Sequence, residues 1–262
     1  MKFLFYLCLI LLLSSCRKEN NFADDITLNF SKDEKLTFQE FNDELGEIGT
    51  SLLYIGESKP QITIKYYRYI LPPSLPRLKT RGHTDAYSIV RQRFEDCNQL
   101  LDKSFFKAEK IQIFETKETF YNLLNSKNLS ISVREKDTIP LYKRNCKTTK
   151  IKNYKAFPVF IKNISTKVLK IPIDAQGVDL YISYNNQLRY IRNSTYVIRG
   201  SEAQPIRYFE LKPDEILVYS YPYFKKGEKT KAKIKIGNAA SKEFEMSIDE
   251  NIIKKIPEGF IK

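Results

Sequence analysis

One segment of the chain carries residue types that acid–base chemistry uses. His83 and Asp85 stand two residues apart within residues 81–85, where a carboxylate could orient an imidazole base or share a metal ion with it. The chain has one His, so a closed metal site would need its other ligands from elsewhere. In the structural alternative, Gly82, Thr84 and Asp85 form a loop that caps a helix.

The sequence lacks the motifs of the common enzyme classes. It contains no G-x-S-x-G, no H-E-x-x-H, no C-x-x-C and no glycine loop that would cradle a phosphate. The adjacent carboxylates at 24–25 and 249–250 fit solvated charge in a linker and a turn. We therefore predict no catalytic residue, no cofactor and no metal ligand. A hydrolase that uses the His83 and Asp85 segment is the alternative.

The first residues of the chain have the pattern of an export signal. Lys2 is followed by an apolar run from Phe3 to Leu13. That run is shorter than the roughly 20 residues that a transmembrane helix needs. A positive start and a short apolar run are typical of a secretory signal peptide.

The run ends in Leu13-Ser14-Ser15-Cys16, which resembles the lipobox of bacterial lipoproteins. The resemblance implies that residues 1–15 are removed and that Cys16 begins the mature chain with lipid, palmitate included, on its sulfur and amino group. Two or more acyl chains are needed for stable membrane attachment. The alternative is an ordinary signal peptide in which Cys16 has no role.

Residues 16–25 are polar and predict a lipidated, flexible tether. Arg17 stands where retention in the inner membrane would favour Asp, so the resemblance implies the outer membrane. Lys18-Glu19 is similar to the export signals of surface lipoproteins in the Bacteroidota. The periplasmic face and the cell surface both stay open.

Two cysteines remain for the mature body. Cys97 and Cys146 would lie in an oxidising compartment, where a disulfide can form. A bond across that separation would stabilise the fold by about 4 kcal/mol in the chain-entropy model. The alternative is a pair of separate buried thiols.

Positive charge suggests a binding surface. The formal net charge is +13. Between Lys229 and Lys235 every second residue is Lys, and a strand would place these side chains on one face. The four lysines are Lys229, Lys231, Lys233 and Lys235. Their face could contact an anionic polymer of the cell envelope. In the alternative, it is a solvated face whose lysines prevent edge-to-edge aggregation. Export disfavours nucleic acid as a partner.

Hydrophobic periodicity divides the remaining chain in two. The periodicity of residues 26–150 predicts a mixed α/β region, with helices that begin near Thr37, Thr84 and Thr116. Strands are predicted at 26–30, 52–55, 62–71, 111–114, 129–133 and 139–142.

A basic stretch without acidic residues, 143–155, marks the predicted boundary. In residues 151–262 the helical period disappears. Short strands predict an antiparallel β-sandwich. They fall at 157–163, 168–173, 178–184, 188–192, 195–198, 206–211, 216–223, 229–236 and 243–248. Residues 157–163 and 211–216 resemble Ig-like modules of bacterial exported proteins. The predicted class is thus α+β, with an α/β region before an Ig-like sandwich.

Taken together, these patterns predict an exported, membrane-anchored lipoprotein. Its body would act as a non-enzymatic module that binds an envelope protein or an anionic envelope polymer.

Overall fold

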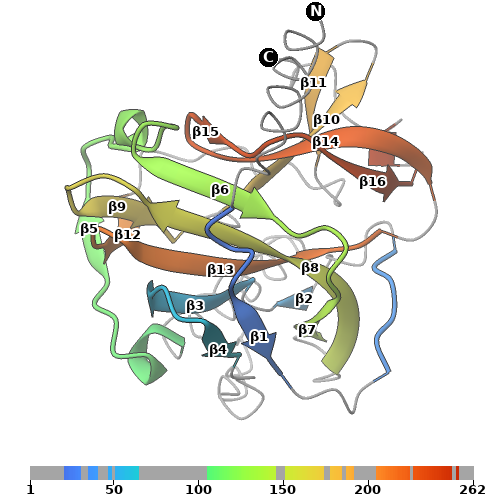
Figure 1. Ribbon diagram of the computed structural model, residues 1–262, viewed down its shortest axis with the longest axis horizontal. Coiled ribbons are helices and arrows are strands. Elements are labelled where there is room, and N and C mark those ends of the chain that lie inside the picture. Colours follow the sequence, from blue (N-terminus) through green and yellow to red (C-terminus); the bar gives the residue numbers. More distant parts are fainter. Residues whose placement is uncertain are drawn as a thin grey trace, which may run out of the picture.

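A computed structural model gives the architecture (Figure 1). It describes residues 21–30, 35–40, 47–48, 51–64, 105–145, 151–173, 178–184, 187–191, 205–224, 227–249 and 252–253. These residues are mostly in antiparallel β-sheets. Helical structure among them is confined to residues 105–108 and 252–253 and to the 3₁₀ helix η1 (Tyr121–Leu123).

The largest sheet, here called the central sheet, has six strands in the order β2-β7-β8-β13-β3, with β6 also paired to β8. Strands β6 and β7 pair with successive halves of the same edge of β8, while β13 covers its other edge. The strands are β2 (Glu47–Ile48), β3 (Leu52–Glu57), β6 (Leu129–Val133), β7 (Ile139–Asn145), β8 (Ile151–Asn163) and β13 (Glu215–Pro222).

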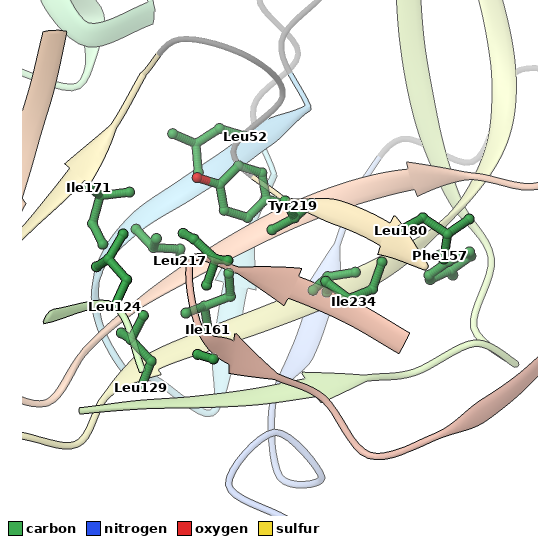
Figure 2. Packing of buried hydrophobic residues seen from close by; sticks show 14 of the residues in the cluster. Leu52, Leu124, Leu129, Phe157, Ile161, Ile171, Leu180, Leu217, Tyr219 and Ile234 are labelled. Atoms are coloured by element: carbon green, nitrogen blue, oxygen red, sulfur yellow. The ribbon is translucent and has the colours of Figure 1, made fainter. Parts of the chain in front are cut away.

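A second sheet, here called the outer sheet, packs face to face with the central sheet, as in a β-sandwich. Its order is β11-β10-β14-β15, with β16 also paired to β14. Figure 2 shows Phe157 and Ile161 of the central sheet in the same cluster as Leu180 and Ile234 of the outer sheet. The strands are β10 (Asp179–Tyr184), β11 (Gln187–Ile191), β14 (Glu228–Ile236), β15 (Ala239–Ala240) and β16 (Phe244–Ile248).

Two smaller sheets complete the described structure. One has the order β5-β12-β9 and adds Ile171 and Phe209 to the same core. The other is a parallel pair, β1-β4. The strands are β1 (Thr27–Asn29), β4 (Gln61–Thr63), β5 (Phe114–Thr116), β9 (Leu169–Pro172) and β12 (Ile206–Leu211).

Strand β8 is buried on both faces. Residues 156–161 are all buried, because Phe157 and Ile161 face the outer sheet while Phe160 packs with Ala23 and Ile26 on the opposite side. A strand covered on both faces has a continuous apolar sequence instead of an alternating one. The run Ala-Phe-Pro-Val-Phe-Ile at 156–161 follows from this position.

Pro158 can lie in this inner strand because of a gap at one edge. β7 pairs with β8 up to Ala156, and β6 pairs with it from Val159. The carbonyl oxygen of Pro158 accepts a bond from the Arg134 amide (3.2 Å) on that edge. The N–H and C=O groups of a strand residue point to the same edge of the strand. The N–H that Pro158 lacks would therefore have no ladder partner at this gap.

Most strand predictions agree with the structure, although the strand predicted at 111–114 overlaps β5 only at Phe114, and β2 and β15 were not predicted. β6 and β12 have the predicted bounds, 129–133 and 206–211, and each other predicted strand within the described residues overlaps an observed one. The predicted strand at 195–198 lies outside the described residues.

The helix predictions agree less well with the structure. The helix predicted from Thr37 is wrong in its described parts, because Thr37 and Gln39 form parallel bridges and Glu47–Ile48 is a strand. Backbone bonds to distant strands override the helical spacing there: the Thr37 amide donates to the Asn153 carbonyl (2.9 Å). The helix predicted after Thr116 is reduced to η1. The helix predicted from Thr84 lies outside the described residues.

Strands from both sides of the predicted boundary at residue 150 share the central sheet. β3, β6 and β7 precede it and β8 and β13 follow it, yet they form continuous ladders. Hydrogen bonds therefore join the two predicted regions in one sheet.

Gln39 is a buried polar residue whose replacement should stabilise the fold. It is 0% exposed, and among the described residues its Nε2 and Oε1 atoms have no hydrogen-bond partner. Such groups lose hydration without compensation, so Gln39→Met should raise the free energy of unfolding by about 1–2 kcal/mol. Urea denaturation measures this value. Gln39→Glu is the control and should lower it, whereas a destabilised Met variant would contradict the prediction.

Candidate functional site

The structure describes only some of the residues that the sequence nominated. Cys16, His83, Asp85, Cys97 and Cys146 lie outside the described residues. The lysines of β14 lie within them, so they form the first candidate surface.

The four lysines do share one face of β14, as the spacing predicts. Ala232, Ile234 and Ile236 alternate with them and are buried against the core. Lys229 and Lys231 are exposed, whereas Lys233 and Lys235 are half-buried. We call this surface the lysine face; it comprises Lys229, Lys231, Lys233 and Lys235.

Acidic neighbours offset most of the charge of the lysine face. Glu243 lies 3.8 Å from the Lys231 Nζ and 3.5 Å from the Lys233 Nζ. Asp179 is the cross-strand partner of Lys235, and Glu245 is that of Lys231. Four ammonium groups thus face three carboxylates, which leaves one net positive charge among these described residues. The field of this face is therefore much weaker than the sequence stripe suggests.

Aromatic rings border the same face. The Lys235 Nζ lies 4.7 Å from the centroid of the Tyr181 ring, and Tyr181 contacts Tyr190 at 5.6 Å between centroids. Burial, with a smaller effect from Asp179, raises the pKa of the Tyr181 phenol. The ring therefore stays neutral and offers its face to the ammonium group. Tyrosine is enriched at surfaces that bind proteins.

The lysines do not protect a sheet edge. β14 pairs with β10 on one side and with β16 and β15 on the other. It is an inner strand, so the interpretation of edge protection is wrong, whereas a solvated sheet face fits the geometry.

Glu243 is the residue whose replacement should expose the charge of this face. Glu243→Gln should strengthen binding to an immobilised polyphosphate up to about fivefold at low salt, because it releases two exposed ion pairs worth up to about 1 kcal/mol. Elution at increasing salt measures the change. Glu57→Gln is the control for net charge, since Glu57, the last residue of β3, forms an exposed pair with Lys59 (3.8 Å). Equal shifts in both variants would show that only net charge matters.

A second feature, absent from the sequence predictions, is an anchored amino-terminal segment. Residues 21–30, here called the docked segment, pack on the central sheet opposite the outer sheet. Ala23 is 0% exposed and Ile26 is 3% exposed. The Asn21 side chain donates a hydrogen bond to the Ser132 hydroxyl of β6. Residues 21–25, which the sequence assigns to the flexible tether, are therefore packed against the body.

Arg134 holds this segment through its backbone. Its Nη1 donates to the carbonyl oxygens of Ala23 (3.1 Å) and Ile26 (2.5 Å). Asp137 accepts from the Nε (2.6 Å) and pairs with Nη2, while the guanidinium carbon lies 5.2 Å from the centroid of the Phe160 ring. The guanidinium group of Arg is planar, permanently charged and has several N–H donors. It can therefore bond several acceptors and stack on an aromatic ring at the same time.

The turn that carries Arg134 is itself held in place. The Tyr223 hydroxyl shares its one proton between the carbonyl oxygens of Glu135 and Asp137, the latter at 3.0 Å. Burial raises the pKa of the Tyr223 phenol; a hydrogen bond with Thr138 partly opposes this rise, and the carboxylates of Glu135 and Asp137 add to it. The phenol thus keeps the proton that these bonds require.

No other chemical centre emerges from the described part of the chain. Within it, no three His, Cys, Asp or Glu residues gather as metal ligands would. Nor does any helix there have the length and apolar character that a bilayer crossing demands.

Comparison with known proteins identifies no relative of this chain. No family model, no curated protein and no solved structure matches this chain.

Proposed function

We propose that this protein is a lipoprotein of the bacterial cell envelope, held to a membrane by acylated Cys16. Its folded body is a non-enzymatic module that binds another envelope component. The lipobox-like ending at Leu13 to Cys16 is the observation that carries the proposal. The outer membrane is the proposed location, and Arg17 in place of Asp supports it.

The docked segment supports a short connection between anchor and body. It is packed on the body from Asn21 onward, and five residue steps separate Asn21 from Cys16. Five steps span at most about 18 Å. The anchor would therefore hold the body close to the bilayer.

We propose the lysine face as the binding surface. Its nearly balanced charge, together with Tyr181 and Tyr190, favours a protein over a polyanion as the partner.

Metabolic labelling with palmitate tests the anchoring proposal. The protein, isolated from its native envelope, should carry label that survives extraction of free lipid and should sediment with membranes. Protein that is unlabelled and soluble would overturn the proposal.

A further inference from the structure

One end of the molecule exposes several large apolar side chains. It is the end where β6 begins and β8 ends (Figure 1). We call it the apolar end, and its exposed fractions of 42–48% contrast with the buried core beside it. Its members are Tyr121 (44%), Leu123 (42%), Ile164 (48%) and Val168 (48%).

Hydrogen bonds place the segments of the apolar end together. The Asn128 Nδ2 donates to the Leu123 carbonyl (2.8 Å), and the Ile164 amide donates to the Asn128 carbonyl (2.9 Å). The Asn163 Nδ2 donates to the Lys167 carbonyl (2.8 Å), which fixes the turn before Val168. The turns that carry these side chains, from two distant parts of the chain, therefore lie together at one end of the molecule.

Lysines surround this apolar surface. Lys127, Lys167 and Lys212 are exposed on the three turns that meet there. Three carboxylates lie at the same end: Asp214 pairs with the Lys162 Nζ at 3.0 Å, Glu215 accepts from the Lys212 amide (2.8 Å), and Glu57 is the cross-strand partner of Glu215. With Lys162, four lysines border the apolar side chains, and exposed apolar side chains together with lysines bind a membrane surface that has anionic headgroups.

The docked segment starts near the apolar end. Asn21 bonds to Ser132, which pairs with Phe160, four residues along β8 from Ile164. Four strand residues span about 13 Å. The five steps from Cys16 to Asn21 reach at most about 18 Å, which is enough to bring the lipid to the level of the apolar end.

The opposite arrangement, with the docked segment itself against the bilayer, has the wrong charge. Asp24 and Asp25 are exposed on the segment. Anionic headgroups would repel these carboxylates.

We propose that the apolar end contacts the bilayer surface, with β6 and β8 roughly perpendicular to the membrane plane. The side chains among the headgroups would be Tyr121, Leu123, Ile164 and Val168. This inference rests on the proposed lipid anchor. The lysine face, which runs along β14, would then remain accessible to a partner.

Tryptophan fluorescence can test this seating, because the chain contains no Trp. Leu123→Trp introduces a reporter at the apolar end. Phe38→Trp is the matched control, since Phe38 is 44% exposed and the bridge from Thr37 to Tyr154 places it toward the far end of β8. Each full-length, acylated variant is reconstituted in vesicles that contain anionic lipid and headgroup-labelled quencher lipid.

The expected result is that the quencher lipid reduces the emission of the Leu123→Trp variant at least twofold more than that of the Phe38→Trp variant. Equal quenching in both variants, or none in the Leu123→Trp variant, overturns the seating while co-flotation with vesicles still supports the anchor. Loss of co-flotation in both variants together with absent acylation overturns the anchor itself. A second reporter, Val168→Trp, should be quenched to the same extent and replaces Leu123→Trp if that variant fails to fold.

Discussion

Replacing Cys16 with Ser is expected to abolish membrane attachment. The hydroxyl of Ser cannot take the thioether-linked lipid that the lipobox implies, so the acyl label should vanish. A single acyl chain already gives only marginal binding, and a chain without any should move almost wholly to the soluble fraction or stay as unprocessed precursor. Ultracentrifugation of lysed cells, with immunodetection, measures the distribution.

Cys8→Ser is the matched control for this variant. Cys8 lies in the apolar run of the predicted signal peptide and leaves with it under this account. The Cys8 variant should therefore be acylated and sediment like the wild type. A Cys16→Ser protein that retains label and sediments with membranes would contradict the assignment of Cys16.

Arg134→Gln is expected to release the docked segment. The variant loses bonds from a charged donor to the carbonyls of Ala23 and Ile26, and leaves Asp137 without this partner. Bonds to charged groups contribute about 1.5–3 kcal/mol each. A loss of about 3 kcal/mol in local stability raises the opening of the segment roughly 100-fold.

Hydrogen exchange of backbone amides measures this opening. The amides of Ile26 and Thr27, which donate to Ala23 (3.2 Å) and Pro60 (2.8 Å), should exchange about 100-fold faster, while those of β14 stay unchanged. Lys136→Gln is the control, because Lys136 is exposed in the same turn. Unchanged protection in the Arg134 variant would show that other contacts hold the segment.

The strands were predictable because their signal is local. Alternation along β14 placed the four lysines opposite Ala232 and Ile234, and the structure has that arrangement. The predicted bounds of β6 and β12 agree with the structure to the residue. In each case the residues that set the pattern lie within the strand or directly beside it.

The helix expected after Thr37 shows where local patterns fail. Phe38, Phe41 and Leu45 have helical spacing, yet Gln39 lies in a bridge with Phe224. Its amide donates to the Tyr223 carbonyl at 3.2 Å. A contact with a residue so distant in sequence leaves no trace in the local period, so propensity was overridden by tertiary bonding.

The contact of Arg134 with the docked segment could not be predicted from the sequence for the same reason. Its acceptors Ala23 and Ile26 lie 111 and 108 residues away in the chain. In sequence, Arg134 belongs to a charged turn, and the residues around Ala23 look like a polar linker. Only the fold brings the two together and shortens the tether. The reduced charge of the lysine face likewise depends on Glu243, which forms ion pairs there, and on Asp179, which reaches the face through sheet pairing.

The mass of the mature amino-terminal peptide tests the central claim most directly. Protein purified from its native membrane in detergent is digested, and the first peptide is sequenced by mass spectrometry. The account predicts a peptide that begins at Cys16 and carries glyceride-linked and acyl mass on that residue. A peptide that begins elsewhere, or an unmodified Cys16 at the amino terminus, would contradict it.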